Sequence, residues 1–373
     1  MTDTIHASRS AHLVGSTPFT DADEAIAIAF DRLGGHLHTV PDGETGDRRN
    51  WIIHIVEALR AHPDLEIARE GDWTDYDRTP VFRVRRGQHL TGDSLDLQHV
   101  APFAEAYPIF ARRRDEAVAA GVPGAGDLAF QVGIPGDFDM ALFVFGPSGP
   151  FLHRRPFSEA TLEEIRTISS RAGRDAAGRS DVVSQLEIPA ELVFVARFPA
   201  PLQPLVARWL GGGVAALAAR SPEGTRFGIH LCVGDMNHRA LATLRDVAPL
   251  VRLANAIGRQ WPAGRSLEFV HAPFAAAVLP PPSPATVDGA RFYRPLSGLR
   301  LPRATRFVAG FVHESPPLVE QQETLALIES LVGRRVDVAT SCGLGRRDRE
   351  AALGTIERAR ELVTSTEPEA LAS

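Results

Sequence analysis

Eight short runs of apolar residues are spaced along the chain, and most of them precede a segment with the periodicity of an amphipathic helix. We expect these runs to form strands at residues 12–16, 37–40, 128–135, 181–189, 226–232, 267–271, 307–313 and 336–340. Strands that alternate with helices in this way predict a (β/α)8 barrel, the TIM barrel, in which each strand is buried on both faces. A doubly wound open sheet is the alternative, but the sequence has neither the glycine-rich dinucleotide motif nor the phosphate loop typical of that fold.

The segments between these runs predict the helices of the barrel. Helical spacing occurs at residues 25–33, 51–59, 102–120, 205–219, 238–257, 318–331 and 347–362, and one further helix is expected to begin at Ser158. Residues 62–97 are polar and aromatic with weak periodicity, and a short strand is expected at 81–84, which indicates an insertion after the second strand. The predicted organisation is a single barrel domain over residues 1–373 with a flexible tail at 365–373.

Composition limits the classes of partner. Charged residues make up 23% of the chain and the net charge is −6, with no basic run of the kind that predicts a nucleic-acid or membrane surface. Residues 1–10 lack the apolar core of a signal peptide, and no apolar stretch reaches the roughly 18 residues that a membrane helix needs. We therefore expect a cytoplasmic protein that acts on small molecules.

The two cysteines of the chain point to a metal site. Cys232 follows His230 by two residues in the fifth run, and Cys342 follows the eighth run. Residues two apart on a strand face the same side, so His230 and Cys232 can bind one ion together with Cys342. Thiolate and imidazole are ligands that suit Zn²⁺. The alternative is that both cysteines are small core residues and His230 is a hydrogen-bonded core histidine.

These motifs resemble a known family. Gly228–Cys232 and Ser341–Leu344 are similar to the zinc motifs in the C-terminal catalytic barrel of cobalamin-independent methionine synthase, a member of the uroporphyrinogen decarboxylase/methionine synthase-like superfamily. Leu13–Ser16 resembles the first strand of that family, and Gln185–Ala190 resembles its acidic, substrate-binding strand end. The loop Pro41–Arg48 resembles a segment of a smaller, largely uncharacterised branch, and the likeness loosely covers most of the chain.

The resemblance implies a zinc ion that activates a thiol to accept a methyl group. His230, Cys232 and Cys342 match the family's ligands, whereas its remaining ligand is a glutamate at the sixth strand end. At that place this chain offers His271, or Glu268 in a shifted register, and both alternatives stay open.

Polar residues at the expected strand ends complete the candidate site, because the strand ends of a barrel face its active site. Glu187 and His313 are the expected catalytic residues, His313 as a general acid or base. Substrate binding is expected from a group of residues at the other strand ends, namely Ser16, Asp42, Glu44, Thr45, Arg48, Gln131 and Glu191. A solvated turn is the alternative for the loop at 41–48, and a surface or helix-cap role for His313 and Glu191. Trp51 is expected in the core.

These features predict a zinc-dependent transferase that moves a methyl or other alkyl group onto a thiol. Its expected partners are a small-molecule thiol and a methyl donor, and a corrinoid protein is a further candidate. Two other functions remain as alternatives: a decarboxylase or lyase of the same barrel type, and a non-catalytic module that binds a metal or a corrinoid protein.

Overall fold

The computed structural model describes residues 8–276 and 279–365, so the predicted tail lies almost entirely outside the described residues. Eight parallel strands form one sheet in the order β1-β10-β9-β8-β7-β6-β5-β2. Their bounds are β1 (Ala11–His12), β2 (Thr39–Pro41), β5 (Ala129–Pro135), β6 (Val182–Glu187), β7 (Arg226–His230), β8 (Ser266–Pro273), β9 (Arg306–Gly310) and β10 (Asp337–Ala339). A parallel bridge between Ala11 and Leu37 links the two edges, so the sheet curls into a nearly closed barrel. The predicted (β/α)8 fold is confirmed.

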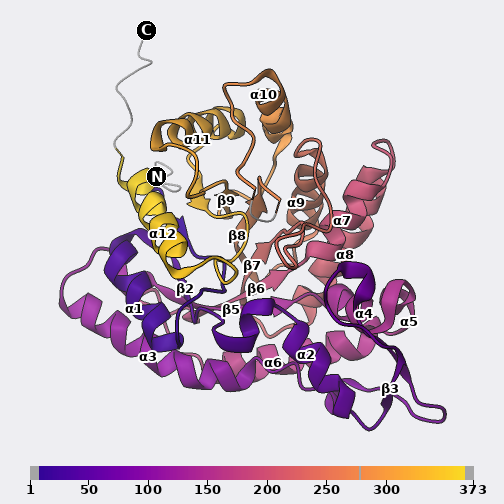
Figure 1. Ribbon diagram of the computed structural model, residues 1–373. Coiled ribbons are helices and arrows are strands. Elements are labelled where there is room, and N and C mark those ends of the chain that lie inside the picture. Colours follow the sequence, from indigo (N-terminus) through magenta and orange to yellow (C-terminus); the bar gives the residue numbers. More distant parts are fainter. Residues whose placement is uncertain (1–7, 277–278, 366–373) are drawn as a thin grey trace.

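Helices surround the strands (Figure 1). Their bounds are α1 (Ala22–Leu33), α2 (Ile53–Ala58), α3 (Val100–Ala119), α4 (Asp137–Phe145), α5 (Gly149–Leu152), α6 (Arg154–Arg171), α7 (Pro189–Arg197), α8 (Gln203–Arg220), α9 (Ala248–Gln260), α10 (Val287–Tyr293), α11 (Leu318–Val332) and α12 (Arg349–Thr364). Capping residues in the sequence explain where two of these helices begin. The carboxylates of Asp21 and Asp348 accept backbone N–H groups at the starts of α1 and α12, which satisfies donors that the helix itself leaves unpaired.

The helix predicted at residues 238–257 is wrong in its first half, because α9 begins only at Ala248. Residues 238–247 form a loop instead, and Leu241 donates its backbone N–H to the carbonyl of Val233. Its apolar residues mimic a helix in sequence because Ala240 and Leu244 pack against the barrel core from the loop. The loop predicted at residues 41–48 is shorter than expected, because a short 3-10 helix begins within it, at Gly46–Asn50.

The predicted insertion is a β-hairpin of β3 (Leu65–Arg69) and β4 (Val81–Val84), which lies beside α2 and α4 (Figure 1). The turn between its strands reaches the loop that follows β7. Tyr76 accepts a hydrogen bond from the backbone N–H of Met236 at 2.9 Å and donates one to the carbonyl of Arg239 at 3.2 Å. Asn237 donates to the carbonyl of Trp73 at 2.8 Å. The hairpin thereby becomes part of the surroundings of the site.

The barrel interior contains polar side chains that bond to one another. Thr39 donates its hydroxyl to Gln131 at 2.7 Å, and the amide groups of Gln131 and Gln185 both donate to the carbonyl of Val14. Gln185 also donates to Glu187 at 3.1 Å. Because buried polar groups are costly without partners, this network holds the end of β1 and the Glu187 carboxyl in place. Among the described residues, no helix is long and apolar enough to cross a membrane.

Candidate functional site

Three possible metal ligands meet at the carboxyl ends of β7 and β10. His230 is the last residue of β7, Cys232 follows two residues later, and Cys342 lies three residues beyond the end of β10. Their ligand atoms all lie within 4.8 Å of one another. The two sulfur atoms are 3.9 Å apart, and two thiolates on a tetrahedral zinc ion would be about 3.8 Å apart with Zn–S bonds of about 2.3 Å. The spacing therefore fits zinc.

Hydrogen bonding and burial shift the pKa values of these three side chains. A hydrogen bond between the two cysteines raises the pKa of Cys232 well above its usual value and lowers the pKa of Cys342. Such a pair of buried sulfurs is suited to a cation, because a cation removes the cost of placing two thiolates together. Burial also lowers the pKa of His230 well below its usual value, so this imidazole is neutral and able to bind a metal.

His271 lies behind His230 and determines which nitrogen of His230 is free. Burial lowers the pKa of His271 to about 4, so the ring is neutral and carries one proton. Its Nε2 lies 2.8 Å from the carbonyl oxygen of Thr340, which can only accept, so the proton is on Nε2. The Nδ1 of His271, 2.7 Å from the Nδ1 of His230, must then accept from it. This leaves Nε2 of His230 without a proton, as a metal ligand requires.

The five residues predicted as metal ligands thus lie in three different surroundings. His230, Cys232 and Cys342 come together, and His271 contacts His230 through its ring. Glu268 lies near the start of β8, where its carboxylate accepts from Arg226 at 3.0 Å. It does not belong to the group of possible ligands found among the described residues.

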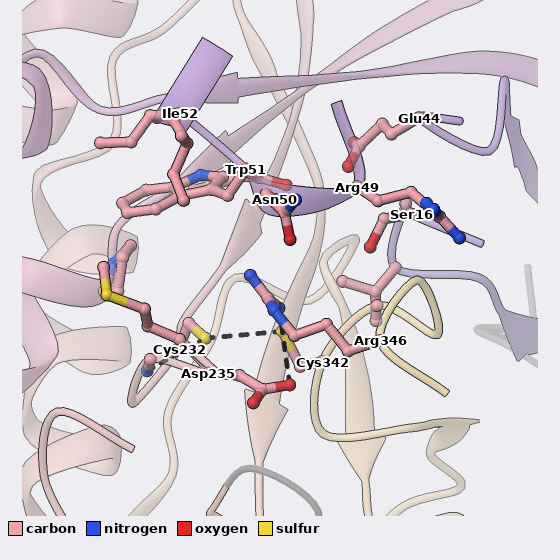
Figure 2. A pocket seen from close by; sticks show the side chains of 18 of the residues that line it. Ser16, Glu44, Arg49, Asn50, Trp51, Ile52, Cys232, Asp235, Cys342 and Arg346 are labelled. Atoms are coloured by element: carbon pink, nitrogen blue, oxygen red, sulfur yellow. Dashed lines mark hydrogen bonds and ion pairs between the residues drawn. The ribbon is translucent and has the colours of Figure 1, made fainter. Parts of the chain in front are cut away.

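A pocket of about 760 Å³ opens above the three ligands. Figure 2 shows the sulfurs of Cys232 and Cys342 on one side and Trp51 on the opposite side. The residues that line it come from both ends of the chain and from the insertion: Val14, Gly15, Ser16, Glu44, Arg49, Asn50, Trp51, Ile52, Ile53, Trp73, Tyr76, Phe143, Glu187, Pro189, His230, Cys232, Gly234, Asp235, Met236, Leu241, Cys342, Gly343 and Arg346. A mostly apolar lining with a few polar groups is typical of a small-molecule site.

Two carboxyl groups from distant parts of the chain, Glu44 in the loop after β2 and Glu187 at the end of β6, lie close together in this pocket. A methyl group placed on Gly133 would lie 2.5 Å from Oε1 of Glu44 and 3.0 Å from Oε1 of Glu187, so both groups need the space above this glycine. Burial raises the pKa of Glu187 to about 7. Burial, and then the charge of Glu187, raise the pKa of Glu44 well above its usual value. The two groups therefore hold at most one negative charge between them near neutral pH.

The loop between β2 and α2 presents Glu44 through an internal ion pair. Asp42 accepts three hydrogen bonds from Arg48, at 2.7, 2.9 and 2.6 Å, and also accepts the backbone N–H of Glu44 at 2.9 Å. Asp42, Thr45 and Arg48 do not line the pocket, whereas Glu44 does. Among the predicted substrate-binding residues of this loop, Asp42 and Arg48 shape the loop and Glu44 faces the cavity.

Three other predicted residues lie away from the pocket lining. Gln131 belongs to the interior network, and Glu191 lies against the buried carboxyl group of Asp139. His313 accepts the backbone N–H of Ser315 at 3.1 Å. Ser16 and Glu187, in contrast, line the pocket as expected.

Several lining residues were missed because they belong to segments without a clear periodic signal. Asp235 is one, and its sequence position three residues after Cys232 was a usable hint. Its Oδ2 lies 3.5 Å from Arg346, and its buried Oδ1 has no hydrogen-bond partner. Trp51, expected in the core, packs on Phe143 and also lines the pocket.

Comparisons with known proteins find solved structures that share the fold of this chain. No protein-family model and no curated protein matches the chain. A B12-independent methionine synthase from Shewanella sp. W3-18-1, solved in complex with selenomethionine, matches with a TM-score of 0.55 and 13% identity, over 96% of this chain and 98% of that chain. A Listeria monocytogenes protein described as a vitamin-B12-independent methionine synthase matches with a TM-score of 0.50 and 12% identity, over 96% and 99%. At such identities the likeness establishes a shared barrel fold.

Proposed function

We propose that this protein is a zinc-dependent methyltransferase that transfers a methyl group to a small-molecule thiol. The observation that carries the proposal is the convergence of His230, Cys232 and Cys342 on the floor of a pocket of about 760 Å³. The shared fold with methionine synthases adds support. The Shewanella protein was solved with selenomethionine, whose methylated selenium corresponds to the methylated sulfur of such a product.

The donor set fits a zinc ion with one position open to the pocket. His230, Cys232 and Cys342 would hold the ion, and the unpartnered oxygen of Asp235 is a further donor in the same pocket. His271 would keep His230 in the required tautomer through the hydrogen bond between their rings. When bound, zinc lowers the pKa of a coordinating thiol, so that the thiolate forms at neutral pH.

The carboxyl pair supplies a binding site for a positively charged part of the acceptor. Glu44 and Glu187 hold at most one negative charge between them when the pocket is empty, and a bound ammonium group would stabilise the ionised carboxylate and donate hydrogen bonds to it. We therefore propose an amino thiol as the acceptor, with its ammonium group on Glu44 and Glu187 and its sulfur toward the metal. Binding at two points orients the sulfur for attack on a methyl group.

The apolar walls of the pocket complete the proposed mechanism. Trp51, Phe143, Met236 and Leu241 surround the space above the sulfurs. Exclusion of water from this space strips the thiolate of its hydration and favours its attack on carbon. Among this chain's own residues, the proposed roles are to bind the ammonium group, to aim the sulfur and to exclude water.

Metal analysis together with a thiol-alkylation assay tests the proposal. The purified protein should bind about one zinc ion per chain, and Cys342→Ser should weaken zinc binding and abolish zinc-dependent alkylation of L-homocysteine by methyl iodide. His89→Gln, a change at an exposed histidine outside the ligand group, is the control. Retention of zinc affinity and alkylation in Cys342→Ser would refute the proposed site, and a protein that turns over without zinc would favour the decarboxylase or lyase alternative.

A further inference from the structure

We propose that the methyl donor is a small onium cation, a methylsulfonium or a quaternary methylammonium compound, held above the metal by an aromatic wall. This wall consists of Trp51, Trp73, Tyr76 and Phe143, all of which line the pocket that contains Cys232 and Cys342. The inference rests on the proposed function and names the donor class for the same site.

The polar groups of the wall residues already have hydrogen-bond partners within the protein. The Trp51 side chain hydrogen-bonds to Glu187, and the Trp73 indole N–H donates to Glu57 at 2.6 Å. The Tyr76 hydroxyl both accepts and donates a hydrogen bond with the loop after β7. The rings therefore have only their π surfaces and edges left for a ligand, and a cation is the partner that an aromatic face attracts most strongly.

The backbone at the wall is held in an unusual conformation. Trp51 has φ of 57° and Trp73 has φ of 56°, in the left-handed region that bulky residues rarely adopt. Glu44, with φ of 40°, is a third such residue, and all three line the pocket. Residues in such conformations persist only where the surrounding structure holds them, and they gather at binding and active sites. Six non-glycine residues of the described chain have a positive φ, and three of them, both tryptophans and Glu44, line this pocket.

The arginines near the pocket are bonded to other groups of the protein. Arg48 is bound to Asp42, and Arg346 lies against Asp235, so these two arginines have partners. Arg49 is exposed at the rim and donates to the carbonyl of Gly46. Glu187 lies next to Trp51, and in the proposed mode it binds the ammonium group of the acceptor together with Glu44, so the aromatic rings remain for the donor. A wall of aromatic rings is the arrangement that recognises quaternary ammonium groups.

The transfer balances without a further reactant. The thiolate sulfur donates an electron pair to the methyl carbon and forms an S–C bond, while the bond from that carbon to the positive sulfur or nitrogen breaks. The electron pair of the broken bond stays on the leaving atom, so the donor departs as a neutral thioether or tertiary amine. No proton moves in this step, and the positive charge of the donor is cancelled by the negative charge of the thiolate.

Binding of an isosteric pair of probes tests the charge requirement. Choline and its uncharged analogue 3,3-dimethyl-1-butanol differ at one atom and should be compared by calorimetry on the zinc-loaded protein. A cation–π contact in a desolvated site predicts tighter binding of choline by about 10- to 30-fold. Trp73→Leu should remove most of this preference and Trp73→Phe should keep part of it. Trp209→Leu, at an exposed tryptophan stacked on Phe151, is the control and should keep all of it. Equal affinity for the two probes, or no measurable binding of choline, would overturn the inference.

A reaction assay separates this inference from the proposed function. The zinc-loaded protein should methylate L-homocysteine with trimethylsulfonium as the donor, and Trp73→Leu should lower kcat/KM for this donor about 10-fold while the rate with neutral methyl iodide stays within about 2-fold. Zinc-dependent reaction with methyl iodide but not with trimethylsulfonium would overturn the donor class and leave the thiol activation standing. Loss of both reactions in a zinc-loaded wild-type protein would refute both.

Discussion

The buried carboxyl group of Glu187 makes a prediction about stability that can be worked out from its surroundings. Burial raises its pKa from 4.5 to about 7 in the folded protein. The unfolded chain releases this proton near pH 4.5 and the folded protein holds it up to about pH 7, so the Glu187 contribution to stability falls as the pH rises through this window. The difference corresponds to about 3 kcal/mol, because one pKa unit is worth about 1.4 kcal/mol.

Glu187→Gln should abolish this dependence, because the amide has the shape of the protonated carboxyl group and still accepts the hydrogen bond from Gln185. The free energy of unfolding of the variant minus that of the wild type should therefore rise by about 3 kcal/mol between about pH 4.5 and pH 7. Burial lowers the pKa of His12 to about 3, so this histidine makes the free energy of unfolding rise with pH, the opposite dependence to that of Glu187. Its contribution is present in both proteins and cancels in the difference between them.

Urea denaturation across this pH range, followed by circular dichroism in the presence of a chelator, measures the difference. Glu223→Gln, a change at an exposed glutamate, is the control and should leave the pH dependence of the wild type unaltered. If the two unfolding free energies of wild type and Glu187→Gln ran parallel over the whole range, the account of a buried, mostly protonated Glu187 would be refuted.

Three further predictions concern the pocket and its surroundings. Gly133→Ala places a methyl group 2.5 Å from Oε1 of Glu44, so it should weaken binding of an amino thiol about 10-fold or more, measured by calorimetry, while zinc content stays the same. His271→Leu removes the acceptor for His230 and should lower zinc affinity about 10- to 100-fold in chelator competition; unchanged affinity would contradict the tautomer argument. Tyr76→Phe removes the hydroxyl that accepts from the Met236 N–H and donates to the Arg239 carbonyl, so these two groups of the loop after β7 keep only their backbone hydrogen bond to each other. Hydrogen exchange in this loop should therefore speed up about 5-fold or more, whereas exchange in β5 should not change.

The ligand trio shows what could be inferred from local spacing. His230 and Cys232 are two residues apart at the end of an apolar run, so the pleat of a strand puts both on one side. Cys342 follows another such run, and strand ends of a barrel share one rim. These two rules suffice to bring the three residues together, and the structure places their ligand atoms within 4.8 Å of one another.

The roles of His271 and Glu268 show where spacing was insufficient. Both lie on β8, and the sequence left both open as the remaining ligand. The hydrogen bonds of the His271 ring to His230 and Thr340 depend on how β8 lies beside β7 and on how near the end of β10 comes to it inside the barrel, and no local pattern contains that information. Likewise, the ion pair of Glu268 with Arg226 follows from the register of two strands.

The sequence by itself therefore determined the eightfold alternation of strands and helices and the placement of the candidate sulfur and nitrogen ligands near the strand ends. Both follow from periodicity, which depends only on the geometry of neighbouring residues in a strand or helix. Only the tertiary structure decided that Glu44 meets Glu187 and that Trp73 and Tyr76 of the insertion close over the loop after β7. These contacts join segments more than a hundred residues apart, and they depend on the curvature of the barrel and on long-range packing, which local periodicity does not encode.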